Sequence, residues 1–125
     1  MGITVKSIGG SSRTIKEFER LSKVAKDPSI LVGPGNNGVN MFRDATPKDS
    51  GVTASKWHHD ERVTRTGSEL VFSNDNVTKD GIPIVVLIKN GHGTGTGGYI
   101  PPNDFITPVV NKIVDDVSSA LERKL

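Results

Sequence analysis

Hydrophobic residues in the N-terminal part of this chain follow two different periods. The alternation in Ile3-Thr4-Val5 predicts a short strand, which Gly9-Gly10 is expected to end. The next apolar residues recur at helical spacing among charged ones and predict a helix capped by Ser11 or Ser12 (Ile15, Phe18, Leu21). Asp27-Pro28 is expected to end that helix, because the residue before proline is disfavoured in the α conformation.

A second, shorter helix is predicted after the glycine-rich segment of residues 33–38. Its inward positions have helical spacing (Val39, Phe42, Ala45), and Thr46-Pro47 is expected to end it. The following Lys48-Asp49-Ser50-Gly51 has the composition of a turn. This part of the chain therefore predicts a helix that is only about two turns long.

The pattern then becomes that of a hairpin. Residues 52–63 suit an extended strand, and alternate residues would share one of its faces (Thr53, Ser55, Trp57, His59, Glu61, Val63). Gly67-Ser68 is the expected hairpin turn, residues 69–73 the returning strand, and residues 74–76 a further turn. Residues 82–88 are apolar but short, so periodicity leaves open whether they form a buried strand or a helical turn and a half.

The C-terminal helix has the clearest pattern. Thr107 is the expected N-cap and Pro108 the first helical residue. Seven residues form the apolar stripe (Val109, Val110, Ile113, Val114, Val117, Ala120, Leu121). Together these elements predict one α+β domain over residues 1–125. It would be a small, mainly antiparallel sheet packed against the N- and C-terminal helices, with a long glycine-rich loop.

Composition narrows the function classes. The chain has 16 Lys and Arg against 14 Asp and Glu, and the two signs are interspersed rather than gathered in a basic arm. It has no cysteine, which excludes disulfides and thiolate zinc sites. No segment has the length and hydropathy of a signal peptide or a membrane span, so we expect a soluble, cytoplasmic protein without a membrane partner.

Two glycine patterns raise the question of phosphate binding. Gly33-Pro34-Gly35-Asn36-Asn37-Gly38 and Gly93-Thr94-Gly95-Thr96-Gly97-Gly98 both match the spacing of a dinucleotide-binding loop. A phosphate cradle needs a helix that opens at the last glycine. Tyr99 and two prolines follow Gly98, and the helix after Gly38 is expected to be too short for a crossover. We therefore expect no nucleotide and no other cofactor.

The histidines allow one alternative. His58 and His59 are neighbours on a predicted strand, so their side chains point to opposite faces and cannot bind one ion together. His58, Asp60 and His92 would make a conceivable three-ligand site of a small metal-dependent hydrolase, and surface histidines are the simpler interpretation. A nucleic-acid-binding module is a further alternative, suggested by the pI of about 9.0. We expect no catalytic set and no metal ligands.

Two motifs, in order, resemble a family of small bacteriophage proteins. The first is ATPKDSGVTASKW, residues 45–57, which follows a helix opened by Gly38-Val39; the second is DGIPIVVLIKNGHGTGTGGYIPPNDFITP, residues 80–108. The chain resembles the tail-completion or head–tail joining proteins of long-tailed phages over residues 30–125. It departs from them where Lys56 separates Ser55 from Trp57, and where Gly33-Pro34-Gly35 interrupts a stretch that tends to be helical in relatives.

The resemblance implies a structural, non-enzymatic virion protein. Such proteins form a ring, expected to be a hexamer of this chain, at the head-proximal end of the tail tube. Their partners are the tail-tube protein and the head connector or adaptor proteins, and assembly takes place in the bacterial cytoplasm. The resemblance marks a turn and strand (Thr46, Pro47, Asp49, Ser50, Gly51, Ser55, Trp57) and an assembly loop (Gly91, His92, Gly93, Thr94, Gly95, Thr96, Gly97, Gly98, Tyr99).

Overall fold

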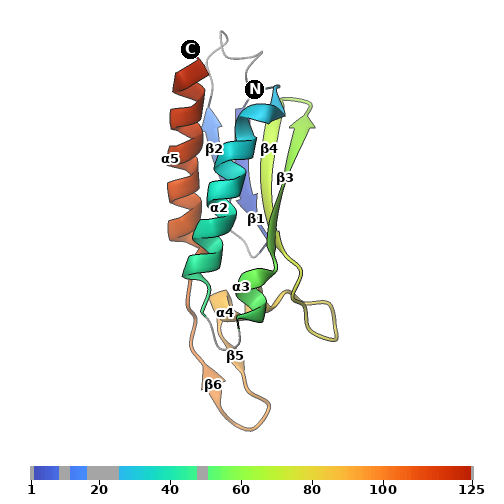
Figure 1. Cartoon of the computed structure of the whole chain (residues 1–125). Helices are drawn as coiled ribbons and strands as arrows, with labels where there is room; N and C mark the ends of the chain where they lie inside the picture. The colour runs from blue at the N-terminus through green and yellow to red at the C-terminus, as the bar shows by residue number, and fades with distance from the viewer. Residues whose placement is uncertain (1, 9–11, 17–25, 48–50, 125) are drawn as a thin grey trace.

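A four-stranded sheet and two long helices form the body of the protein. The computed structural model describes residues 2–8, 12–16, 26–47 and 51–124. The sheet has the strand order β2-β1-β4-β3 (Figure 1). Its strands are β1 (Gly2–Ser7), β2 (Ser12–Lys16), β3 (Trp57–Thr64) and β4 (Gly67–Asn74). The expected α+β class, with a mainly antiparallel sheet, is confirmed.

Pairing in this sheet is antiparallel except at its centre. β1 pairs antiparallel with β2, and β3 pairs antiparallel with β4. The central pair, β1 and β4, is parallel, with Val5 opposite Leu70. Parallel neighbours need a crossover connection, and the long segment between these strands, which contains a helix, supplies it. The alternation predicted for Ile3 and Val5 is confirmed, since both are fully buried on the face of the sheet that the helices cover.

The helices that cover this face are α2 (Val32–Ala45) and α5 (Ile106–Lys124). They lie side by side in front of the sheet (Figure 1) and contact each other as well as its strands. One hydrophobic core lies between the two layers. Its large members come from every part of the chain (Ile3, Val5, Leu31, Phe42, Trp57, Leu70, Phe72, Val85, Ile106, Ile113, Val117). The apolar stripe predicted for the C-terminal helix is confirmed, with Val114 only partly buried.

α2 begins earlier than the sequence predicts. Asp27 caps a 3-10 turn, η2 (Pro28–Leu31), by accepting hydrogen bonds from the amide and hydroxyl of Ser29, and these bonds lower the pKa of its carboxyl. The α-helix continues from that turn through Gly33 and Pro34. Proline is tolerated there because the first turn has no partners for its amides. The glycine-rich segment is therefore helical, where we expected it to lie outside the helix.

The start of α5 also differs by a few residues from its predicted place. Thr107 lies in the first turn and is not the N-cap; its amide and hydroxyl both donate to the carboxylate of Asp104, at 3.1 and 2.7 Å. Partial burial acts to raise the pKa of Asp104. The hydrogen bonds from Thr107 and Ile106 and the charge of Lys89 outweigh that effect and hold the pKa below its ordinary value. Asp104 is therefore the side chain that satisfies the free amides of this helix end.

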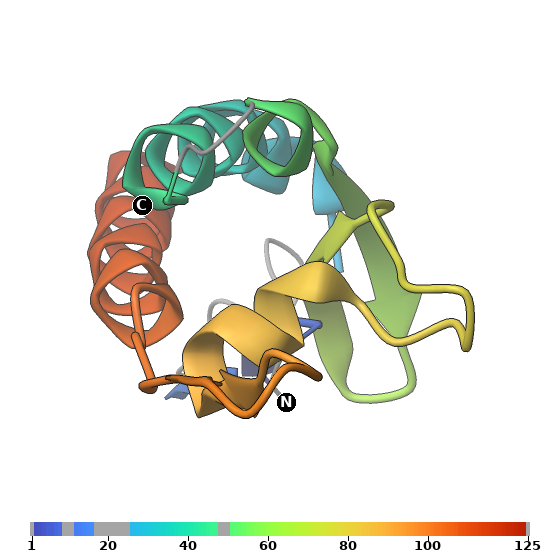
Figure 2. The ribbon, with the colours of Figure 1, turned by 90° about the horizontal axis from the view of Figure 1, so that it is seen from below.

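Four small elements form the lower end of the molecule. They are α3 (Val52–Ser55), α4 (Ile84–Asn90), β5 (His92–Gly93) and β6 (Tyr99–Ile100). Seen from below, α3 lies beside α2, and α4 lies on the side of the sheet (Figure 2). β5 and β6 extend furthest from the body (Figure 1). Residues 84–90 are thus a helix, which settles the choice that periodicity left open for this segment.

Several other predicted elements need correction. Residues 12–16 form strand β2 rather than the start of a helix, and the predicted continuation at Phe18 and Leu21 lies outside the described residues. Residues 52–55 are a helical turn, so the predicted strand begins only at Trp57. The hairpin turn is at residues 65–66, because Gly67-Ser68 already belong to β4. Ala45 is exposed, whereas the end of α2 before Thr46 is as predicted.

Candidate functional site

The segment GHGTGTGGYI, residues 91–100, is a β-hairpin that we call the arm. His92 pairs with Ile100 and Gly93 with Tyr99. Beyond this ladder the amide of Thr94 donates to the carbonyl of Gly98, and the amide of Gly98 donates to the hydroxyl of Thr94. These bonds close the tip of the arm. The predicted glycine-rich loop is therefore a short hairpin with a defined turn.

Glycine is required at particular positions of the arm. Gly95 and Gly97 in its tip have φ of 80° and 90°, in the left-handed region that other residues rarely adopt. Gly91, at the base, has φ of 78°, and a side chain there would meet the hydroxyl of Tyr99 at 2.6 Å. The repeated glycines of this motif thus serve the conformation of the hairpin and its close packing at the base.

Two contacts fix the base of the arm to α4. The ring of His92 donates from Nδ1 to the carbonyl of Leu87 at 3.2 Å, since a carbonyl oxygen only accepts. The amide of Asn103 donates to the carbonyl of Ile88 at 2.9 Å. The arm is consequently attached to the body at both of its ends, and its tip extends beyond these attachments (Figure 1).

A groove of about 890 Å³ lies between the arm and the lower end of the body. One wall is the inner side of the arm with the segment that follows it (His92, Gly93, Thr94, Ile100, Pro101, Pro102, Asn103), and the other comes from α3, α4 and the end of α2 (Pro47, Gly51, Thr53, Ile84, Ile88). None of these residues is Asp, Glu, Lys or Arg. The groove is therefore suited to an apolar or uncharged polar segment.

The two groups of residues that the resemblance marks meet only in part. Pro47 and Gly51 line the groove together with arm residues His92 to Thr94, whereas Asp49 and Ser50 lie outside the described residues. No pattern in the sequence marks Ile84, Ile88, Thr53 or the two prolines as site residues. The Pro101-Pro102 step was visible in the sequence, but only the fold brings it opposite α3 and α4.

Thr46, Ser55 and Trp57 have structural roles. The indole Nε1 of Trp57 donates to the hydroxyl of Thr46 at 2.8 Å, and that hydroxyl donates to the carbonyl of Phe42. The Trp57 ring stacks on Phe42 with centroids 4.3 Å apart. Ser55 donates to the carbonyl of Val52 within α3. This part of the first motif thus fixes the end of α2 to the start of β3.

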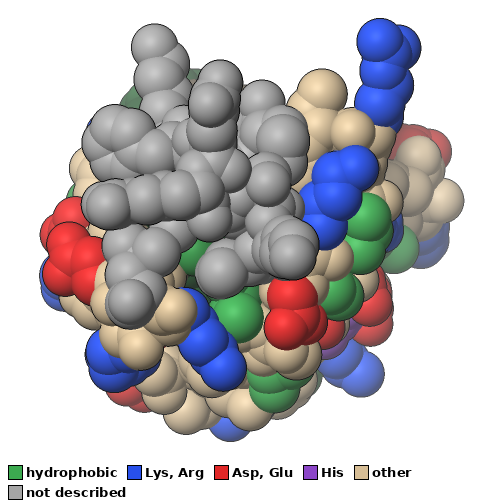
Figure 3. Space-filling view, turned by 90° about the horizontal axis from the view of Figure 1, so that it is seen from above, with side chains coloured by type: hydrophobic (Ala, Val, Ile, Leu, Met, Phe, Trp, Pro, Cys, Tyr) green, Lys and Arg blue, Asp and Glu red, His purple; other side chains and the backbone are tan. Residues whose placement is uncertain are grey.

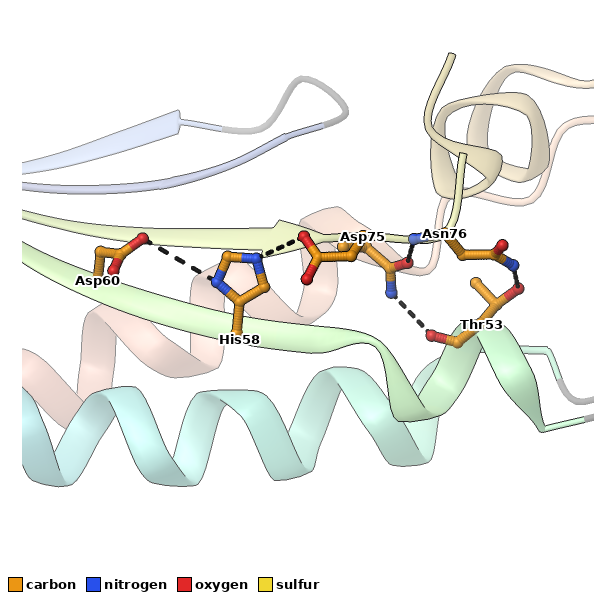
Figure 4. Close-up of polar contacts among 6 residues, drawn as sticks. Thr53, His58, Asp60, Asp75 and Asn76 are labelled. Atoms are coloured by element: carbon orange, nitrogen blue, oxygen red, sulfur yellow. Dashed lines mark hydrogen bonds and ion pairs between the residues drawn. The ribbon is translucent and has the colours of Figure 1, made fainter. Parts of the chain in front are cut away.

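His58 lies in a polar network at the other side of the sheet. Its Nε2 is 2.8 Å from Asp75 and its Nδ1 is 4.0 Å from Asp60, so both ring nitrogens face carboxylates (Figure 4). The three ionisable side chains are 43–69% exposed, so such pairs contribute little to stability.

The same network joins the hairpin to α3. The side chain of Asn74 donates to the backbone carbonyl of Thr53, and that of Asn76 donates to the hydroxyl of Thr53, both at 2.8 Å (Figure 4). The amide of Asn76 donates back to the side chain of Asn74, which closes the predicted turn after β4. These contacts place α3, and with it Thr53 in the wall of the groove.

His59 points to the opposite face, as its place in the strand predicts. Its Nδ1 is 2.6 Å from a carboxylate oxygen of Glu61 and its Nε2 is 3.0 Å from the side-chain oxygen of Asn36 on α2. The approach to Glu61 is close but is not aligned as a hydrogen bond. Within the described ranges no three His, Asp or Glu side chains form a group that could hold a metal ion, and His92 lines the groove rather than approaching His58 and Asp60.

Neither glycine pattern forms a phosphate cradle. Gly33, Gly35 and Gly38 lie inside α2, where Gly35 packs against His59 and Gly38 against Phe72 and Ile113. Gly93, Gly95 and Gly98 belong to the hairpin, and no helix begins after them until Ile106. Both patterns therefore have conformational and packing explanations.

Charges of both signs are mixed on the face of the molecule that Figure 3 shows. Lysine, arginine and acidic side chains alternate over the upper end of the molecule in the part that Figure 3 shows uncovered. Among the described helices none is long and apolar enough to cross a bilayer. Comparison of the chain with protein-family models, with curated proteins and with solved structures found no match.

Proposed function

We propose that this protein is a structural component of a virion, the tail-completion or head–tail joining protein of a long-tailed bacteriophage. The observation that carries the proposal is the arm. It projects from one end of the body, and it is formed by the second of the two motifs in which the chain resembles that family. An arm of this form is suited to binding another protein, because its outer strand edges are available for backbone pairing.

The remaining chemistry supports a non-enzymatic role. Among the described residues that line the groove none is Asp, Glu, Lys or Arg, so these residues supply no acid–base pair of the usual kind for proton transfer. His92 is held by Leu87 through one ring nitrogen. The ring of His58 contacts Asp75 at 2.8 Å through Nε2, and its Nδ1 lies 4.0 Å from Asp60. We therefore propose that the protein acts by binding partners: further copies of itself in a ring, expected to be hexameric, the tail-tube protein, and the head connector or adaptor proteins.

The location in the particle tests this function. A phage lacking the protein should produce full heads and complete tails that remain unjoined, seen by electron microscopy. Addition of the purified protein to that lysate should restore infectious particles, whereas protein with a shortened arm (residues 93–97 removed) should not. A matched control is Asp115→Ala, which changes an exposed side chain of α5 and should restore joining fully. Normal joining without the protein, and its absence from purified virions, would exclude the proposed role.

A further inference from the structure

The arm and the three residues that follow it form one of two long uncharged stretches in this chain; the other, residues 28–42, lies in η2 and α2. Residues 91–103 contain no Asp, Glu, Lys or Arg, although at 24% charged residues a stretch of this length would hold about three. The described residues that line the groove are equally free of charged side chains. A surface loop has no solubility reason to exclude charge so completely. An arm that becomes buried against an uncharged surface has a reason to lack charged residues, because a charge that is buried without a partner is strongly unfavourable.

The outer side of the arm presents a large side chain to solvent. Ile100 faces the groove of its own chain, whereas Tyr99, its neighbour in β6, is 63% exposed. Adjacent residues in a strand point to opposite sides, so Tyr99 projects from the side of the arm that faces away from its own groove. Tyrosine is enriched at the centres of protein interfaces because it combines apolar area with a hydroxyl group.

We propose that the arm of one copy binds in the groove of the next copy, with Tyr99 as its anchor. The same chain supplies both uncharged surfaces, and the outer side of the arm, which carries Tyr99, is distinct from the groove. The contact is therefore head to tail and can be repeated around a ring. The proposal deepens the proposed function and rests on it for the place of assembly. A single hairpin gives a weak contact, and closing a ring, in which each copy makes two contacts, strengthens it.

Cross-linking between single-cysteine variants tests the contact, since the chain has no cysteine of its own. Thr96→Cys places a thiol at the tip of the arm, and Thr53→Cys places one in the wall of the groove. The two variants, mixed and oxidised, should form a disulfide-linked heterodimer. The control pair is Thr96→Cys with Ser119→Cys, an exposed residue near the other end of α5. We expect at least a tenfold lower yield for the control, and a similar loss when Tyr99→Ala is added to the first pair.

Equal yields for the two pairs would overturn the proposal. So would an undiminished yield with Tyr99→Ala. A chain that fails to cross-link in this way but is still needed for head–tail joining would show that the arm binds a different partner, and the proposed function would stand without the contact. Specific cross-linking by a chain that is absent from virions would leave the contact and exclude the proposed function.

Discussion

Gly35 on α2 lies directly against the imidazole of His59 on β3. A methyl group at position 35 would overlap Nδ1 of that ring and approach its other atoms. The ring cannot simply turn away, because its Nε2 faces Asn36 at 3.0 Å and its Nδ1 faces Glu61 at 2.6 Å. The helix can approach the strand this closely only because residue 35 has no side chain.

Gly35→Ala should destabilise the protein by about 1–3 kcal/mol, the range of overpacked sites, although alanine is the better helix former. His59→Ala removes the ring and should restore much of the loss, so the two changes should be non-additive by roughly 1 kcal/mol or more. Urea unfolding followed by the emission of Trp57 measures these free energies. Asn40→Ala, on an exposed position of the same helix, is the control. Strict additivity of the two changes would contradict the contact.

We expect Thr46 to stabilise the fold through the hydrogen bond that its hydroxyl accepts, rather than through the space that its side chain fills. Thr46→Val keeps the shape but leaves the buried indole N–H of Trp57 without its partner, which should cost about 1–3 kcal/mol of unfolding free energy. Thr46→Ser retains the hydroxyl and should lose clearly less. Equilibrium denaturation of the three proteins makes the comparison, and equal losses for valine and serine would show that the bond contributes nothing.

Ile113 is fully buried between α5, α2 and the sheet, so Ile113→Ala should lower the unfolding free energy by about 2–5 kcal/mol. Asp115, two residues along the same helix, is exposed. Asp115→Ala should therefore change stability by less than about 0.5 kcal/mol. Thermal unfolding monitored by circular dichroism tests both, and a comparable loss in the two variants would mean that α5 is buried on all sides.

The cap at Asp104 predicts a loss of stability in acid. The pKa of its carboxyl is lower in the folded protein than its ordinary value of 3.8, so folding favours the ionised form. This contribution is complete above pH 3.8 and is lost as the pH falls through the lower folded-state pKa. Asp104→Asn keeps a capping side chain without a titrating group. Its stability should fall less than that of the wild type between about pH 5 and pH 2; parallel pH profiles would assign the acid loss to other groups.

Shortening the arm should separate assembly from folding. Removal of residues 93–97 deletes five exposed residues, all of them glycine or threonine, so the melting temperature should stay within a few degrees of the wild type. Gly95→Pro should act in the same direction, because proline fixes φ near −65° whereas Gly95 has φ of 80°. Size-exclusion chromatography should show the loss of self-association in both. Stabilisation of the wild type alone by phosphate or a nucleotide would instead favour a phosphate-binding arm.

The local sequence pattern was sufficient to predict an element and its buried face where the buried residues follow the period of that one element. The apolar stripe of α5 could be read directly from its spacing, and so could the strand at Ile3 and Val5, because each of these elements buries one continuous face. The opposite directions of His58 and His59 also follow from the strand alone. The sequence thereby excluded a site that needs both histidines, without any knowledge of the fold.

Tertiary contacts decided the elements whose local signals conflict. Residues 33–38 have the glycine content of a loop, yet they are helical because Gly35 and Gly38 allow α2 to pack closely against His59, Phe72 and Ile113. Ile15 has helical spacing with residues after it, yet it pairs with Ile3 at the edge of the sheet. In both cases burial against distant residues outweighs a local preference of about 1 kcal/mol or less per residue.

The groove was beyond prediction for the same reason. Its walls come from segments that are up to 56 positions apart, from Pro47 to Asn103, and no local pattern relates them. The glycines of the arm were visible in the sequence, but their backbone conformation was not. A glycine with φ of 80° in a hairpin cannot be distinguished by sequence from a glycine inside a helix. The sequence by itself determined that two segments, residues 33–38 and the arm, are uncharged and rich in glycine. The tertiary structure decided that one such segment packs inside the body and the other projects from it, because close packing between elements depends on neighbours that only the folded chain brings together.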